Sequence, residues 1–311
     1  MYYCFKDKET SPVSLSEIDG SQLVAGCIGL EELKSCYQDF GFAEATVQHC
    51  MAEAENFGVG LEQYDGYTFG FVSILNFYDI DAAEKRMAFY IRENLFLLVN
   101  CYDVSDEVTR IFENSVQRCK RLPTLEKIIY GVLDNLIVNG NKILDAQESK
   151  IMQLEDELIL KKEHKNLNEY IFIIKKELIV QNHFYEQLIY IGEELEENEN
   201  NIFKLEHLRY FKIFSNKALR LSKYNEVLSE NLVHLREAYE AYLEYSLNNT
   251  MKVYGAVTII CLPLSLIATW YGMNFTNMPE LQYRYGYLAI ILVSLLMMIL
   301  LIYLLKKKNL F

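Results

Sequence analysis

The spacing of hydrophobic residues changes along the chain, and in its first third short hydrophobic runs alternate with polar breaks. Residues 1–120 hold three runs rich in aromatic and β-branched side chains, which are typical of strands: 67–74, 87–91 and 95–102. The last two flank Arg92-Glu93-Asn94, which predicts a hairpin. Helical spacing in residues 29–36 and 43–56 completes the prediction of a small α/β domain.

From residue 122 onward hydrophobic residues recur every three or four positions, which predicts helices. Pro123 suits a helix start, because its missing N–H has no intrahelical partner there. We expect one helix over residues 124–160, a second over 167–195 and a third over 202–271. The third would be about 100 Å long at roughly 1.5 Å per residue, and a helix of that length favours oligomerisation.

Two segments near the C-terminus, 253–271 and 287–305, carry no charged residue. Each is close to the roughly 20 residues that cross a bilayer as a helix, and Pro263 is tolerated in such a helix. The basic tail Lys306-Lys307-Lys308 predicts a cytoplasmic end. Two spans then place both termini on the cytoplasmic side of a multi-pass protein of the cytoplasmic membrane.

Together these elements predict an α+β cytoplasmic domain, long stalk helices and two transmembrane helices. Along the chain the expected divisions are the α/β domain at 1–120, long cytoplasmic helices including the stalk at 121–249, the first transmembrane helix at 250–271, an outer loop at 272–286, the second transmembrane helix at 287–305 and the basic tail at 306–311.

Charge and cysteine content exclude several classes of protein. A net charge of -13 over 311 residues argues against nucleic acid as a partner, because phosphate binding needs clustered Lys and Arg. The cysteines form no Cys-x-x-Cys pair, and the histidines lack metal-ligand spacing. We find no phosphate-binding loop, nucleophile elbow or paired catalytic carboxylates, so neither enzyme activity nor a cofactor is expected.

An acidic segment, residues 193–199, holds five glutamates. Their mutual repulsion predicts that the segment does not pack and forms a solvated turn between helices. It could also concentrate divalent cations, and the two interpretations are compatible.

The first span has small and polar residues on one helical side, which we name the polar face: Asn248, Met251, Gly255, Thr258, Leu262, Ser265 and Thr269. Two interpretations are open, close helix packing through small residues and the lining of a pore. The second span has only Ser294 as a polar interior residue, which predicts an outer helix facing lipid.

Gly272-Met273-Asn274 follows the first span directly. The glycine frees the backbone to leave the helix, and the asparagine offers an uncharged amide oxygen. Mg²⁺ gives up its water reluctantly, so a ring of neutral oxygens could hold the hydrated ion through its waters. We therefore predict Asn274 as a water-mediated metal contact in a selectivity filter formed with Gly272 and Met273.

The C-terminal region resembles the CorA-type magnesium transporters. The resemblance rests on motifs that occur in order: Leu262-Pro263-Leu264, Ile267-Ala268, Tyr271-Gly272-Met273-Asn274-Phe275, Met278-Pro279-Glu280-Leu281, Tyr285-Gly286-Tyr287 and the lysine tail. It is specific over residues 243–311, looser across the stalk and faint before residue 120.

The resemblance implies a homopentamer in the lipid membrane, with a funnel-shaped cytoplasmic domain and one central pore for divalent cations. It implies that Glu280 attracts cations at the outer loop and that these residues line the pore: Asn248, Met251, Tyr254, Thr258, Leu262, Ser265, Thr269 and Glu237. Mg²⁺ is the expected transported ion and a candidate regulator. Yet the stretch Tyr210–Phe214 lacks the carboxylate that holds regulatory Mg²⁺ in the family, and Tyr254 is bulkier than the aliphatic residue expected there.

The expected function is channel-like entry of Mg²⁺, with Co²⁺ and Ni²⁺ as further candidate ions, driven by the membrane potential. The alternatives are a Zn²⁺ transporter of the same family and a membrane-anchored coiled-coil scaffold that transports nothing. The scaffold accounts for the helices but leaves Gly272-Met273-Asn274 and the polar face unexplained.

Overall fold

The computed structural model describes residues 1–6, 9–13, 22–53, 58–75, 85–103, 106–119, 123–159, 167–273, 278 and 284–307. The chain divides into two compact units, Met1–Leu235 and Arg236–Phe311. Helix α8 (Arg209–Tyr271) runs through the boundary between them.

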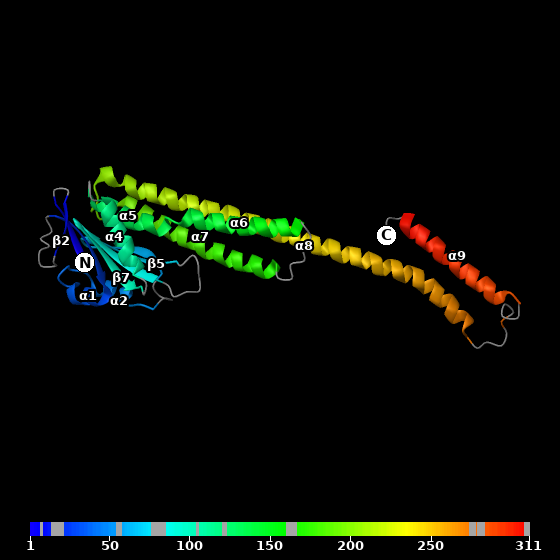
Figure 1. Cartoon of the computed structure of the whole chain (residues 1–311). Helices are drawn as coiled ribbons and strands as arrows, with labels where there is room; N and C mark the ends of the chain where they lie inside the picture. Colours follow the sequence, from blue (N-terminus) through cyan, green and yellow to red (C-terminus); the bar gives the residue numbers. More distant parts are fainter. Residues whose placement is uncertain are drawn as a thin grey trace. The chain divides into compact units, whose positions relative to one another are not determined.

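The first unit is built on a seven-stranded mixed sheet (Figure 1). Its strands are β1 (Tyr2–Lys6), β2 (Glu9–Val13), β3 (Leu23–Gly29), β4 (Gly60–Tyr64), β5 (Tyr67–Ile74), β6 (Lys85–Arg92) and β7 (Leu95–Tyr102), in the order β2-β1-β3-β7-β6-β5-β4. Only the β3–β7 pair is parallel among these described strands. The predicted strand at 67–74 and the predicted hairpin are confirmed, and Asn94 takes the left-handed conformation that its turn requires (φ 58°).

Helices cover both faces of the sheet. Short helices α1 (Leu30–Cys36) and α2 (Glu44–Cys50) bury Leu33 and Val47 against the aromatic side chains of β5 and β6. Helices α4 (Glu107–Cys119) and α5 (Leu125–Ile137) contact β7. Strand side chains alternate between the two faces of a sheet. Because helices cover both faces, the central strands β6 and β7 each contain a long run of consecutive buried residues.

The predicted single helix over 124–160 is wrong, because two helices occupy that range. Helix α5 is capped by the Thr124 hydroxyl, which accepts from the Lys127 N–H at 3.3 Å, and it ends at Ile137. Helix α6 (Gly140–Ile159) then begins at a glycine. A Cβ on Gly140 would lie 2.7 Å from a Leu221 methyl carbon, so a glycine allows α6 to start this close to α8.

The acidic segment lies at the end of α7 (Leu167–Glu197), and the prediction that it does not pack is wrong. Leu195 is buried. The Asn198 side chain accepts a hydrogen bond from the Phe203 N–H and donates one to the Phe203 carbonyl, each at 3.0 Å. The Asn200 amide donates to the Gln63 side chain of β4 at 2.7 Å. Asparagine contacts therefore fix this turn against the sheet, while Glu193, Glu197 and Glu199 remain exposed as expected.

Helix α8 begins later than expected, after a 3₁₀ turn at Leu205–His207. Helices α6, α7 and the first part of α8 lie side by side in the first unit (Figure 1), linked by contacts such as Ser222 to Asn182 at 2.9 Å. Phe211 and Phe214, in the stretch without the expected carboxylate, are fully buried. Those positions belong to the hydrophobic core, so they hold no ion ligand in this chain.

Candidate functional site

Both uncharged segments are helical, as predicted. The first lies within α8, whose helix continues through Pro263, and the second forms α9 (Gly286–Lys307). Both are long and apolar enough to cross a membrane, with mean hydropathies of 1.8 and 3.1, and 6% of each span is buried within the chain. Side chains that are this apolar and this exposed need lipid or another protein surface around them.

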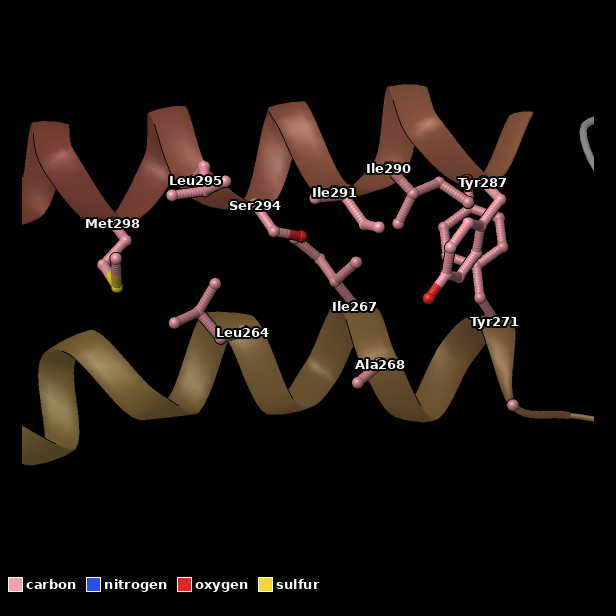
Figure 2. Close-up of a pocket in the computed structure, with 11 residues that line it drawn as sticks. Leu264, Ile267, Ala268, Tyr271, Tyr287, Ile290, Ile291, Ser294, Leu295 and Met298 are labelled. Carbon is pink, nitrogen blue, oxygen red and sulfur yellow. The ribbon is translucent and has the colours of Figure 1, made fainter. Parts of the chain in front are cut away.

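Within the second unit, the membrane part of α8 has two distinct sides. Leu264, Ile267 and Tyr271 lie towards α9 and line a cavity between the two helices (Figure 2). The polar face lies on the opposite side, because its residues are offset from these by about half a turn at roughly 3.6 residues per turn. All seven of its residues are exposed in the single chain.

The two threonine hydroxyls on the polar face donate their protons within the helix itself. Thr258 donates to the Tyr254 carbonyl at 2.9 Å, and Thr269 donates to the Ser265 carbonyl at 2.7 Å. A hydroxyl that has donated its one proton keeps its lone pairs as acceptors. This side of α8 therefore presents oxygen acceptors, which suit the outward-pointing protons of a hydrated cation.

The predicted pore residues below the membrane segment continue on the same side of the helix. Glu237 is exposed there, and Glu244, which was not among the predicted residues, is exposed on the same side. Glu244 lies seven residues after Glu237 and four before Asn248, so the same periodicity could have found it. Tyr254 also lies at the edge of the polar face and is 66% exposed.

The first two residues of the predicted filter close the helix. The Gly272 N–H donates to the Ala268 carbonyl at 3.0 Å and to the Thr269 carbonyl at 3.2 Å. A Cβ on Gly272 would lie 3.1 Å from the Ala268 oxygen, so the tight helix end favours a glycine. Met273 is exposed. Asn274 and Glu280 lie outside the described residues, and their assigned roles stay predictions.

Ser294, on the helix predicted to face lipid, does not lie on an outward-facing side of α9. Figure 2 shows its hydroxyl directed towards α8, and it lines the cavity between the helices. On the opposite side of α9, Leu292, Leu296 and Leu300 are exposed, as expected for a helix surface that faces lipid.

Among the described residues no group of three His, Cys, Asp or Glu side chains could hold a metal ion. In the first unit, two carboxylates converge on one tyrosine: the Tyr224 hydroxyl lies 3.0 Å from Asp145 and 2.8 Å from Glu148. Burial, together with hydrogen bonds to these two carboxylates, raises the pKa of Tyr224. The three side chains join α6 to α8.

Comparison with known proteins places these features in a family. The profile described as CorA-like Mg²⁺ transporter protein matches residues 30–307. The "Cobalt/magnesium transport protein CorA" of Thermotoga maritima is 26% identical over 226 residues, which are 69% of this chain and 63% of that protein. The chain thus spans less than two thirds of the length of that relative. The "Putative metal ion transporter YfjQ" of Bacillus subtilis is 25% identical over 81% of this chain and 77% of its own length.

Among solved structures, the CorA magnesium transporter from Methanocaldococcus jannaschii has a TM-score of 0.81 at 17% identity. That match covers 98% of this chain and 96% of the other. At this identity the likeness concerns the fold, and it confirms the predicted architecture of a mixed-sheet domain, a long helix and two apolar C-terminal helices.

Proposed function

The chain belongs to the family of CorA-like Mg²⁺ transporter proteins, and on that premise we propose that it carries Mg²⁺ into the cell through a pore lined by the polar face of α8. We place it in the cytoplasmic membrane with both termini in the cytoplasm. The lysines at the end of α9 support that orientation. We assign the site residues and the ion, and the choice of ion is supported by relatives that are named as magnesium transport proteins.

One observation carries the proposal: α8 exposes a continuous side of small and polar residues on the side away from α9. Polar side chains at membrane depth face a protein interior or a water-filled cavity. All seven residues of the polar face are exposed in the single chain, which supports an arrangement in which several copies surround a common cavity. Gly255 agrees with this, because a Cβ there would meet no atom within 4 Å in the single chain.

We propose a homopentamer in which five copies of α8 surround the pathway. Asn274 would form the outer ring and hold the hydrated ion through its water, and Glu237 and Glu244 would concentrate cations at the inner end. Entry needs no further energy source, because the membrane potential contributes about 2.3 kcal/mol per charge per 100 mV, or roughly 4.6 kcal/mol for a divalent ion. Mg²⁺ is also the regulator we would test first, and we expect it to bind elsewhere than at the buried side chains Phe211 and Phe214.

The test is uptake of Mg²⁺ by a bacterial strain that depends on added magnesium because it lacks its own transporters. The wild-type chain should restore growth at low Mg²⁺, and Asn274→Ala should abolish the rescue. Asn248→Ala, on the polar face, should reduce uptake, whereas Asn249→Ala, an exposed neighbour off that face, should leave it unchanged.

Three results would overturn parts of the proposal. Uptake of Zn²⁺ without Mg²⁺ would favour the zinc alternative. Unchanged uptake in Asn274→Ala would remove the ring of asparagines from the selection of the ion. No uptake of Mg²⁺, Co²⁺, Ni²⁺ or Zn²⁺ by a correctly inserted protein would favour the scaffold.

A further inference from the structure

The cavity between α8 and α9 has a volume of about 570 Å³, within the range of roughly 300–1,000 Å³ that is usual for ligand pockets. It lies wholly within the second unit. Its walls include Leu264, Ile267 and Ala268 from α8 and Ile291, Leu295 and Met298 from α9 (Figure 2).

The two ends of this cavity differ in chemistry. Apolar side chains line its length, and Ser294 is the hydroxyl-bearing residue part-way along it. Tyr271 and Tyr287 lie together at the end next to Gly272 (Figure 2). Tyrosine rings favour the boundary between hydrocarbon and head groups, with the ring in the apolar layer and the hydroxyl in the polar one. The cavity therefore runs from hydrocarbon depth to the membrane surface.

The shape and the lining of the cavity favour a slender apolar occupant. From Tyr287 to Met298 a helix rises by about 16 Å, so the cavity is long, and its walls are apolar apart from Ser294 and the two tyrosines. A helix of a second copy is the competing occupant, and the test below distinguishes it from an acyl chain. Water is disfavoured, because apolar cavities stay dry.

We propose that this cavity binds one acyl chain of a membrane phospholipid, with the head group next to Tyr271 and Tyr287. The chain would fill the space between α8 and α9, which would otherwise leave Ile267 and Ile291 without contacts on that side. The polar face of α8 is directed elsewhere, so the acyl chain and the proposed ion pathway use opposite sides of one helix.

The proposed lipid site requires that α8 and α9 lie in the membrane. It does not depend on the proposed transport of Mg²⁺. An occupied cavity would contact Gly272, so the bound chain would stabilise the helix end that leads to Asn274. This gives the bilayer a direct contact with the proposed filter.

The test uses the full-length protein in vesicles of phosphatidylethanolamine and phosphatidylglycerol. A small fraction of the phosphatidylglycerol carries a photoreactive diazirine midway along one acyl chain. After irradiation, peptide mass spectrometry should place most adducts on cavity residues such as Leu264, Ile291 and Met298. Leu295→Trp, which fills the cavity, should lose these adducts. Leu296→Trp is the matched control, because Leu296 is the adjacent leucine, is 64% exposed and does not line the cavity.

Equal labelling of both tryptophan variants would overturn the proposal, and so would adducts spread evenly around α9, which would indicate only the surrounding lipid. Cross-links between cavity residues and a second copy of the chain would also overturn it. If Leu295→Trp fails to insert, Ser294→Leu fills the same space with a smaller change. Mg²⁺ uptake measured on the same vesicles separates this result from the proposed function, since labelling can fail while transport persists.

Discussion

The first and last parts of α8 use hydrophobic side chains in opposite ways. Up to Leu235 the helix buries Phe211, Phe214 and Leu228 in the core of the first unit. Beyond that point Met251, Leu262 and Leu266 are each more than 60% exposed, and Ala256 is the buried hydrophobic residue among those described in this part of the helix. Within one continuous helix, the first part therefore packs into a core within the chain, whereas the last part leaves its hydrophobic side chains exposed, as a membrane-spanning segment does.

The largest expected difference between these parts concerns folding stability. Phe214→Ala should lower the free energy of unfolding of the first unit by about 3–5 kcal/mol, because it leaves a cavity in a fully buried core. Leu300→Ala, at a 56% exposed position on α9, should change it by less than about 0.5 kcal/mol. Denaturant titrations of the full-length protein in detergent, followed by circular dichroism, measure both. Equal losses would mean that the last part also depends on a core within the single chain.

A carboxylate introduced either on the exposed side of α9 or on the polar face of α8 tests which of these surfaces faces lipid. Leu296→Asp puts a carboxylate on the exposed side of α9 and should disfavour membrane insertion by about 2.5–3.5 kcal/mol. Ser265→Asp lies on the polar face and should be inserted far better, because the pathway supplies water. The amount of protein recovered in the membrane fraction measures the insertion of each variant. Equal yields from the two variants would contradict the assignment of the faces.

The smallest effect concerns the contact between α6 and α8 in the first unit. Tyr224→Phe removes hydrogen bonds to Asp145 and Glu148 and should cost about 0.5–1.5 kcal/mol of stability. Because the pKa of Tyr224 is raised in the folded state, its contribution is present below the unfolded pKa of 10.0 and is lost as the pH rises through the folded value. Unfolding at pH 8 and above pH 10 should therefore differ less in Tyr224→Phe than in the wild type. An unchanged difference would remove Tyr224 from this pH dependence.

Local pattern was enough to predict the features that depend on neighbours within a few residues. The hairpin at Asn94, the two spans and the polar face all follow from periodicity or turn chemistry. The break before Gly140 was not predicted, although Asn139-Gly140 is a turn signal in the sequence. What the sequence does not show is the close approach of Gly140 to Leu221, which lies 81 positions further along the chain. The packing of the acidic turn depends in the same way on Asn200 reaching Gln63, and the cavity depends on how α9 lies against α8.

Glu244 is a different kind of omission. Its spacing from Glu237 and Asn248 is visible in the sequence, so helical periodicity alone was enough to place it on the same side of the helix. For Asn274 the position is reversed. The sequence and the family resemblance predict it as a filter residue, but it lies outside the described residues, which reach Gly272 and Met273 just before it.

The most direct test of the central claim is a cysteine accessibility scan of α8 in a Cys261→Ser background. Single substitutions to cysteine at 257–270 would be treated with a charged, thiol-specific methanethiosulfonate reagent while Mg²⁺ uptake is recorded in vesicles. We predict that modification inhibits uptake at Thr258, Leu262, Ser265 and Thr269. Leu264, Ile267 and Ala268, which lie towards α9, should be unaffected. Inhibition at the α9-facing positions, or inhibition without helical periodicity, would contradict a pathway along the polar face.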